Sequence, residues 1–304
     1  MNRIFNHKFF YIGFLAFVFS IFLQSSSLAE TTIERIKRTG VIRAGAWKDA
    51  EPFGYVNEKG KWVGYGIDMM TVVKSQLEKA LKKPLKLELI EVNTQNRFDL
   101  VMDGKVDISC GPTTFTWNRE KYVDFSLSYF VTGTQLLVKK GTKLDSLKDL
   151  RSLRIGVERN TTTENVLKVL DTRLNLVTVA NGKDGFSQLQ QGKIDVYAGD
   201  GILLEALKQR ATKPDTWEIV PPDDLISRES YACLLRENDS NWRDFVNYSI
   251  LRAIQGYLIE DPEFKQMFDG WFGESGVVPY SQEVLTNHFQ GIVDSVERIP
   301  KTAF

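Results

Sequence analysis

Apolar residues recur every three or four positions in several stretches of the chain, and they alternate with polar residues in others. The first pattern predicts amphipathic helices, and the second predicts half-buried strands. The expected helices are 31–38, 67–82, 97–103, 162–170, 184–191, 202–210, 242–260 and 263–272. The expected strands are 41–47, 53–56, 61–63, 85–92, 106–110, 135–138, 154–158, 174–179, 194–198 and 227–236. We expect a loop over 48–52, and a peripheral helix and tail over 281–304.

Strands and helices alternate along both halves of this order, which favours an α/β fold with a mostly parallel sheet in each half. Residues 98–108 and 186–196 also match each other at a constant offset of 88 positions. The same offset pairs Asp200 with Pro112, so polar residues follow equivalent strands in both halves. Because ligands of open α/β sheets collect beyond the carboxyl ends of strands, we expect a cleft between two lobes.

Two extended passages, residues 122–140 and 227–236, connect the halves. We interpret them as two hinge strands, with the hinges near residues 129–134 and 229–233. The C-terminal helices would then return to the first lobe. The expected boundaries are 30–131 plus 232–304 for lobe 1 and 132–231 for lobe 2.

The first 29 residues differ in composition from the rest of the chain. Arg3 and Lys8 precede an apolar run over residues 11–23, and small polar residues then lead to Ala29. This order is typical of a secretory signal peptide that is cleaved after Ala29. A retained N-terminal anchor is the alternative, but the apolar run is short for a membrane-spanning helix. We therefore expect residues 1–29 to be removed on export.

The charge balance argues against a nucleic-acid partner. The chain has 39 basic and 39 acidic residues, and loss of residues 1–29 leaves 37 basic against 39 acidic. A nearly neutral mature chain has no basic surplus for nucleic acid. His288 is the one histidine of the expected mature chain, so the sequence offers no Ser–His–Asp set and no cluster of His and Cys ligands. We expect neither a metal nor a cofactor.

Cys110 and Cys233 are the two cysteines of the chain. An exported protein matures in an oxidising compartment, where a pair of cysteines favours a disulfide. Two buried free thiols are the alternative. A bridge would close a long loop, which stabilises a fold by a few kcal/mol in the chain-entropy account.

The segment after the predicted strand 106–110 carries the candidate chemistry. Pro112 lacks an N–H and the following hydroxyls bond local backbone, so the strand cannot continue. We expect a polar loop that leads to a helical turn with Thr116 as its N-cap. Free helix N–H groups, the Thr114 hydroxyl and the Arg119 guanidinium together suit a small carboxylate. Arg119 can instead cap its helix or pair with a surface acid.

Several further segments form a longer-range pattern. They are Phe53-Gly54-Tyr55, Gly64-Tyr65-Gly66-Ile67-Asp68, Thr94-Gln95-Asn96-Arg97, Cys110-Gly111-Pro112-Thr113-Thr114, Asp124-Phe125-Ser126, Gly133-Thr134-Gln135-Leu136-Leu137, Lys213-Pro214-Asp215-Thr216-Trp217 and Tyr231-Ala232-Cys233. With them, residues 33–272 resemble the periplasmic amino-acid-binding proteins of ABC transporters, solute-binding family 3, and are most similar to its glutamate/aspartate-binding branch. The resemblance implies a monomer with the type II periplasmic-binding-protein fold, located in the periplasm. It also implies an amino-acid ligand, an inner-membrane ABC permease as partner and a disulfide between the two cysteines.

The resemblance implies roles for individual residues as well. Arg119, with Thr114 and the backbone around Pro112, would hold the ligand α-carboxylate. Thr162 would help to close on that carboxylate from the second lobe. Asp200 would take the α-ammonium group, although as a residue that precedes a predicted helix it can also be a simple N-cap.

Thr94, Arg97 and Trp47 fall where the resemblance places the side chain of the ligand. The glutamate/aspartate branch has an arginine in place of Trp47 and a histidine in place of Gly182, and both help to hold a second carboxylate there. Tryptophan cannot pair with an anion as arginine does. The ligand therefore stays open among glutamate, aspartate, their amides and other amino acids. As alternatives to ligand contact, Arg97 can form a structural ion pair with an acidic residue, and Trp47 can pack in the hydrophobic core.

Two other functions stay open at this point. One is an enzyme on the same fold, such as a cyclohexadienyl or arogenate dehydratase, in which carboxylates would act as acid or base. The other is a ligand-sensing domain that feeds a signalling receptor. We expect a transport receptor and not an enzyme, because His288 lies in the predicted tail, away from the candidate site.

Overall fold

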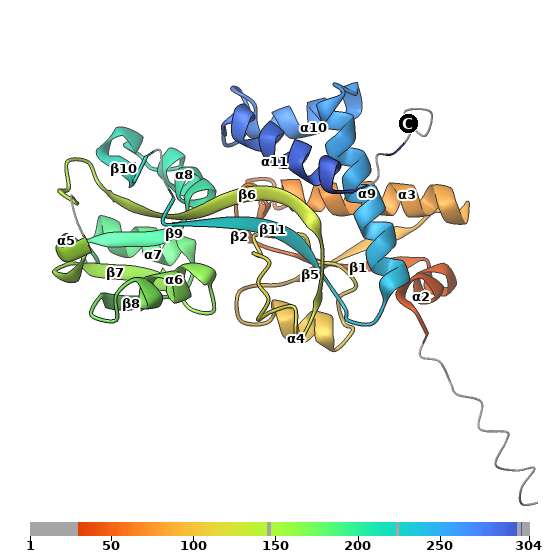
Figure 1. Ribbon diagram of the computed structural model, residues 1–304, viewed down its shortest axis with the longest axis horizontal. Coiled ribbons are helices and arrows are strands. Elements are labelled where there is room, and N and C mark those ends of the chain that lie inside the picture. The colour runs from red at the N-terminus through yellow and green to blue at the C-terminus, as the bar shows by residue number, and fades with distance from the viewer. Residues whose placement is uncertain (1–29, 145–146, 223–224, 297–298, 300–304) are drawn as a thin grey trace, which may run out of the picture.

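The chain forms two lobes that lie side by side and are joined by two long strands, β6 (Asp124–Lys139) and β11 (Ser227–Leu235) (Figure 1). The computed structural model describes residues 30–144, 147–222, 225–296 and 299, so the expected signal peptide lies outside the described residues. We call the part with the N-terminal and C-terminal helices, on the right of Figure 1, lobe 1, and the other part lobe 2.

Lobe 1 is built on a pair of parallel strands. β1 (Val41–Ala46) pairs with β5 (Lys86–Glu91), and Ala44 makes a further parallel bridge to Ile108. A separate antiparallel sheet contains β2 (Asp49–Ala50), β3 (Gly54–Val56) and β4 (Trp62–Val63). The helices of lobe 1 are α2 (Thr32–Thr39), α3 (Tyr65–Leu81), α4 (Arg97–Met102), α9 (Ser240–Leu258), α10 (Pro262–Phe272) and α11 (Gln282–Ser295).

Lobe 2 is built on one mixed sheet. Its own strands are β7 (Arg154–Glu158), β8 (Asn175–Val179), β9 (Val196–Asp200) and β10 (Trp217–Val220). With β6 they form the order β10–β6–β9–β7–β8, in which β7 is parallel to both of its neighbours. The helices of lobe 2 are α5 (Leu147–Arg151), α6 (Thr162–Leu170), α7 (Gly182–Gln190) and α8 (Gly201–Gln209), with a 3₁₀ turn over Pro214–Thr216.

The chain passes from lobe 1 to lobe 2 along β6 and returns along β11. The two strands are antiparallel partners, and their pairing runs from Thr134 opposite Ser227 to Asp124 opposite Leu235. The register shifts twice near Ala232, where the ladder is interrupted. This paired ribbon therefore connects the lobes, and its irregular part lies beside the cysteine of β11.

The sequence repeat corresponds to a repeated structural unit. In lobe 1, Asp107 Oδ2 accepts a hydrogen bond from the backbone N–H of Arg43 at 2.7 Å and its Oδ1 pairs with the guanidinium at 2.7 Å. In lobe 2, Asp195 Oδ2 accepts from the backbone N–H of Arg154 at 2.8 Å and its Oδ1 pairs with that guanidinium at 2.8 Å. Each aspartate thus ties the segment after a glycine-ended helix to a neighbouring strand, β1 in lobe 1 and β7 in lobe 2.

Of two expectations for the candidate loop, one was wrong and one is confirmed. Residues 106–110 form only isolated bridges, Ile108 to Ala44 and Ser109 to Leu234, and no continuous strand. The helical turn that we expected after Thr116 is present, since Thr116 Oγ1 accepts from the Arg119 N–H at 3.2 Å and the Thr116 carbonyl accepts from the Glu120 N–H at 3.0 Å. The chain enters β6 at Asp124, before a second helical turn can form.

Two smaller expectations also failed. Asp49–Ala50 is the strand β2, where we expected a loop over 48–52. The predicted peripheral segment 281–304 contains α11, whose Leu285, Phe289 and Val293 are buried in the core of lobe 1. An apolar stripe at helical spacing indicates burial, and that stripe is present in the sequence. Residues 297–298 and 300–304 of this segment lie outside the described residues.

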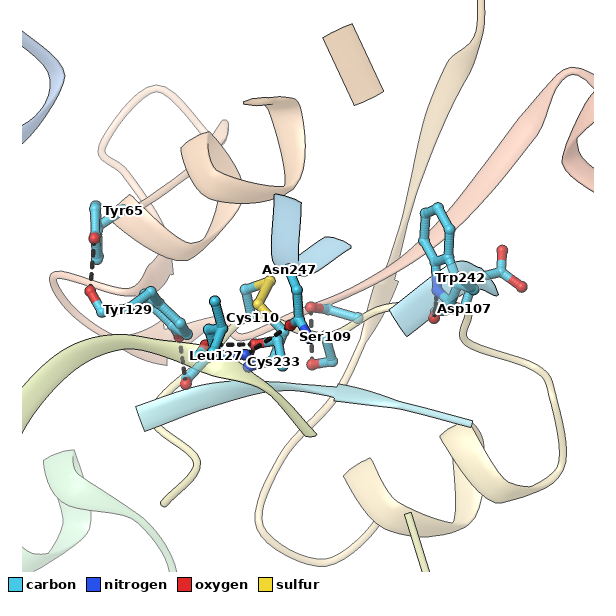
Figure 2. Close-up of a disulfide and its surroundings, with 12 residues drawn as sticks. Tyr65, Asp107, Ser109, Cys110, Leu127, Tyr129, Cys233, Trp242 and Asn247 are labelled. Atoms are coloured by element: carbon cyan, nitrogen blue, oxygen red, sulfur yellow. Dashed lines mark hydrogen bonds between the residues drawn. A yellow bond between two sulfur atoms is a disulfide. The ribbon is translucent and has the colours of Figure 1, made fainter. Parts of the chain in front are cut away.

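The predicted disulfide between Cys110 and Cys233 is confirmed, with an S–S distance of 2.04 Å (Figure 2). It joins the start of the candidate loop to β11 across 123 positions of sequence. Buried tyrosines support the same loop, since Tyr129 Oη donates to the Gly111 carbonyl at 2.7 Å and Tyr65 Oη donates to the Tyr129 carbonyl at 2.8 Å. The start of the loop is therefore fixed by the disulfide at Cys110 and by the hydrogen bond at Gly111.

Candidate functional site

A cavity of about 950 Å³ lies between the lobes. Residues of lobe 1, including α4 and the loop after Cys110, line one wall, and the ends of β7 and β9 with the starts of α6, α7 and α8 line the other. The wall contains every ligand residue expected from the sequence: Trp47, Thr94, Arg97, Pro112, Thr114, Arg119, Thr162 and Asp200. The candidate residues thus meet in one crevice, which local sequence patterns could only suggest.

Arg119 reaches from the lobe 1 loop toward lobe 2. Its Nη1 donates to the Thr114 carbonyl at 2.8 Å, and its Nη2 donates to the Asn160 carbonyl at 3.2 Å. The guanidinium carbon lies 5.3 Å from the centre of the Phe98 ring. Burial lowers the pKa of Arg119, while Glu229 and Asp200 act in the opposite direction. The side chain is held in place, and its charge faces acidic groups of the other lobe.

Asp200 ends β9 and stands immediately before α8. Its carboxylate makes no capping bond to that helix, and it accepts from Tyr231 Oη and from Thr163 Oγ1, the latter at 3.3 Å. Burial and the nearby Glu229 raise the pKa of Asp200 to about 7. A carboxylate in that setting gains from a cation beside it, since the cation favours its ionised form.

Glu229 of β11 is a site residue that our sequence reasoning missed. It is 3% exposed and receives four hydroxyl groups. Oε2 accepts from Thr114 at 2.6 Å and from Thr162, and Oε1 accepts from Ser227 at 2.9 Å and from Thr134 at 3.1 Å. The sequence around Glu229 gave little signal, because its neighbours Arg228 and Ser230 are also polar. Both threonines expected to hold a ligand carboxylate donate to Glu229 in this arrangement.

Arg97 lies deeper in the cavity wall and is 2% exposed. Its Nη2 donates to the Asn160 carbonyl at 3.2 Å, whereas Nε and Nη1 are buried without a hydrogen-bond partner among the described residues. The guanidinium carbon lies 5.4 Å from the centre of the Trp47 ring and 4.8 Å from that of Phe98. Burial, and then the charge of Arg119, lower the pKa of Arg97 to about 9.

Glu158 is the second site residue that sequence reasoning missed. It ends β7, one strand away from Asp200, and its Oε1 accepts from Thr94 Oγ1 of lobe 1 at 2.7 Å. Burial and the charge of Asp49 raise the pKa of Glu158 to about 7, although Thr94 and Arg97 act against them. Its place at the carboxyl end of a strand was a usable signal, as it was for Asp200.

We name two parts of the cavity after their arginines. The Arg119 end comprises Pro112, Thr114, Arg119, Thr162 and Asp200. The Arg97 end comprises Trp47, Thr94, Arg97 and Glu158.

Trp47 shapes the floor of the Arg97 end. Its ring packs so closely on the candidate loop that a Cβ added to Gly111 would lie 2.1 Å from Trp47 Nε1. Only glycine fits at position 111 without a shift of the indole. The Trp47 Nε1 atom is buried and has no hydrogen-bond partner within the described ranges. Trp47 therefore both packs and lines the cavity.

Contacts between the lobes keep the walls together. Arg210 of lobe 2 pairs with Glu51 of lobe 1 at 2.7 Å, and Thr114 Oγ1 lies 3.5 Å from Thr162 Oγ1. The Asn160 carbonyl accepts from arginines of lobe 1 as described above. Because these contacts join opposite walls, separation of the lobes would break them together.

Two further properties concern the chain as a whole. Among residues 30–144, 147–222, 225–296 and 299, no group of three or more His, Cys, Asp and Glu side chains is arranged to hold a metal ion. Within the same ranges, no helix has the length and apolar character needed to cross a membrane.

Comparison with known proteins decides the family. The family model described as "Bacterial extracellular solute-binding proteins, family 3" matches residues 42–274. The chain belongs to this family. Its fold is the type II periplasmic-binding-protein fold, α/β with mostly parallel sheets flanked by helices, as the resemblance implied.

Proteins similar to this chain carry names for different ligands. The chain is 33% identical over 249 residues to the "Glutamate/aspartate import solute-binding protein" of Salmonella typhimurium, which covers 80% of each chain. It is 32% identical over 210 residues to the "Glutamine-binding protein" of Geobacillus stearothermophilus, which covers 68% of this chain and 77% of the relative. A solved structure titled "An ancestral arginine-binding protein bound to glutamine" is 27% identical with a TM-score of 0.67, covering 77% of this chain and 99% of that one. The chain is nearly equally identical to a relative named for glutamate and aspartate and to one named for glutamine. Sequence identity therefore does not decide which ligand this chain binds, and the residues of the site have to be considered.

Proposed function

We propose that the chain is a periplasmic receptor that binds one free polar amino acid, either glutamate or aspartate or one of their amides, and delivers it to an inner-membrane ABC permease. One observation carries the proposal: Arg119 of lobe 1 and Asp200 of lobe 2 line the same cavity. A guanidinium and a carboxylate on opposite walls complement the two charges of a zwitterion. The relatives named above support the amino-acid class.

The Arg119 end would bind the part of the ligand that all amino acids share. Arg119 and the backbone around Pro112 would hold the α-carboxylate, and Asp200 would hold the α-ammonium group. Thr114 and Thr162 now donate to Glu229, so they would donate to the α-carboxylate only after their hydroxyl groups rotate away.

The side chain of the ligand would lie at the Arg97 end, between Thr94, Arg97 and Trp47. The ligand would close the lobes by contacts to both, since only a closed form brings both charged walls to it. The lobes would comprise residues 30–131 plus 232–304 and residues 132–231, with hinges near 129–134 and 229–233. Residues 1–29 would be cleaved as the signal peptide, and the mature chain would act as a monomer without nucleic acid.

We propose a receptor and not an enzyme. His288 does not line the cavity; its Nε2 lies 2.8 Å from Ser128 Oγ, and burial lowers its pKa to about 4. Asp200 and Glu158 are the groups that could serve as acids, since the pKa of each is raised to about 7. An assay for turnover of prephenate or arogenate therefore belongs beside the binding test, and turnover of either would overturn the non-enzyme assignment.

Isothermal titration of the mature chain against the twenty common amino acids tests the receptor role. Circular dichroism on the same sample establishes that the protein is folded. We expect heat of binding for at least one polar amino acid. A folded protein that binds none of the twenty would remove the proposed function.

A further inference from the structure

The Arg97 end places hydrogen-bond donors on one lobe and an acceptor on the other. Arg97 of lobe 1 has two buried donor atoms, Nε and Nη1, without a partner in the part of the chain that the structure describes. Glu158 of lobe 2 directs a carboxylate at the same space, with Oε1 bound to Thr94 at 2.7 Å. Leaving a buried donor unpaired is costly, so a small shift of the guanidinium that brings one of these donors to an acceptor atom of the ligand would be favoured.

The formal charges around this end do not favour an additional anion. Arg97 faces Glu158, and next to them Asp49 of β2 and Lys183 of α7 line the same cavity. Arg97 and Asp49 both act on Glu158, Arg119 and Asp200 act on Arg97, and Lys183 and Glu91 act on Asp49. Three cations and four anions attract no additional anion. A second ligand carboxylate would gain from Arg97 and lose to Glu158.

We propose that Arg97 and Glu158 together recognise a side-chain carboxamide, so that the receptor prefers glutamine or asparagine to glutamate or aspartate. This inference rests on the proposed function, which places an amino acid in the cavity. The amide oxygen would accept from Arg97, and the amide NH₂ would donate to Glu158. A carboxylate can satisfy only the first of these groups, because its second oxygen would oppose the Glu158 carboxylate. The preference for amides would come from the repulsion between a ligand carboxylate and Glu158 as much as from the hydrogen bond that the amide NH₂ donates to Glu158.

The matched pairs glutamine and glutamate, and asparagine and aspartate, differ only in the group that this end would contact. We therefore expect isothermal titration at pH 8 to give at least about tenfold tighter binding of one amide than of its matched acid, the effect of one charge-assisted hydrogen bond. L-arginine is included to test a purely cationic side chain. The full mature chain is used, so both lobes are present.

The variant Glu158→Gln tests the residue directly. The introduced carboxamide can donate to a ligand carboxylate, so we expect the ratio of amide affinity to acid affinity to fall by about tenfold or more. Glu283→Gln is the matched control, because it makes the same change on the exposed surface of α11, far from the cavity. The control should keep the ratio of the unchanged protein.

Each outcome decides one of the two claims. Acid binding as tight as amide binding at pH 8, or tight binding of arginine with none of the amides, overturns the carboxamide inference and leaves the receptor role intact. A preference for the amide that Glu158→Gln does not reduce overturns the role of Glu158. Should that variant fail to fold, the ratio measured on the unchanged protein still decides. A folded protein that binds no amino acid removes the proposed function and this inference with it.

Discussion

The two ends of the cavity hold the same kinds of charge in different settings. At the Arg119 end, each charged group is already engaged, with Arg119 on two carbonyls and Asp200 on two hydroxyls. At the Arg97 end, Arg97 keeps two donors without partners among the described residues, and Glu158 has Thr94 as its donor. Under the proposed function, the Arg119 end binds the α-carboxylate and α-ammonium groups that every amino acid carries. The Arg97 end contacts the side chain of the ligand. Affinity and choice of ligand would then depend on separate residues.

Removal of Arg119 should have the largest effect. Truncation of one member of a buried charge pair costs about 2–5 kcal/mol, so Arg119→Ala should weaken binding by about 30-fold or more. Most of the loss should be common to glutamine and glutamate, because Arg119 would hold the α-carboxylate; a smaller extra loss is expected for glutamate, since Arg119 also acts on Arg97. Isothermal titration of both ligands measures it, and Arg119→Lys, which keeps the charge but not the planar guanidinium, should give an intermediate affinity. A change in the ratio of the two affinities as large as the common loss would contradict the separation of the two ends.

Asp200→Asn should come next. The variant keeps the shape and the bond from Tyr231 but loses the charge that would hold the α-ammonium group, so all ligands should bind about 10- to 100-fold more weakly. The folded protein should not lose stability at neutral pH. The raised pKa of Asp200 means that its ionised form is disfavoured in the folded protein. Ionisation therefore lowers the free energy of unfolding, an effect that is absent below pH 4 and fully present above pH 7. Thermal denaturation without ligand, at pH 5 and at pH 8, checks this; a large drop in Tm at pH 8 would contradict it.

The pH of the measurement should change ligand choice through Glu158. With a pKa of about 7, Glu158 is mostly protonated at pH 6 and mostly ionised at pH 8. Glutamine and glutamate side chains do not titrate in this range. The ratio of glutamine affinity to glutamate affinity should therefore rise with pH, by up to about tenfold.

The other groups around Glu158 do not account for such a change. The titratable groups close to it are Asp49, Arg97, Tyr197 and, beside Asp49, Lys183. Desolvation raises the pKa of Tyr197 further above this range, and the pKa of Arg97 stays near 9. The burial that raises the pKa of Asp49 is partly offset by Lys183. The ratio should be flat with pH in Glu158→Gln, and a slope that survives in this variant would point to Asp49 or to Asp200, whose pKa is also raised to about 7.

Addition of a cation at the Arg97 end should have the smallest effect. A Cβ on Gly182 would lie 3.5 Å from Leu207 Cδ1 and 3.6 Å from Tyr197 Oη, so the position has room for a side chain. Gly182→His should raise glutamate affinity by a few fold at pH 6, where an ordinary imidazole is charged, and little at pH 8. Gly182→Gln should leave both ligands unchanged. An equal gain for glutamine in the histidine variant would argue against a charge effect.

Periodicity and turn chemistry predicted most of the fold. The strand over 154–158 and the helix over 162–170 agree with β7 and α6 at both ends, because both have strong apolar patterns and α6 begins after a capping threonine. The short alternating run at 106–109 satisfied the same rule and failed. Whether such a run becomes a strand depends on partners, and here neighbouring segments supply only single bridges.

The candidate site was predicted in part. Arg119 and Asp200 follow strand-like segments and carry charge, so position and chemistry together indicated them, and both line the cavity. Glu229 was missed because three of its four hydroxyl donors are distant in sequence: Thr134 of β6, Thr114 of the candidate loop and Thr162 of α6 meet it only in the folded molecule. Glu158 was missed because its donor, Thr94, is distant in sequence and belongs to the other lobe.

By itself, the sequence determined the order of helices and strands and the repeat of residues 98–108 at 186–196. It also determined that the chain has two cysteines and that charged residues follow the ends of strands. These depend on local spacing and on residue chemistry, which a linear chain already contains. The tertiary structure alone decided which charges face each other. The opposition of Arg97 to Glu158, and of Arg119 to Asp200, arises from two lobes meeting along β6 and β11. Burial then sets the pKa of each group, and burial is a property of the packed molecule, not of any one segment.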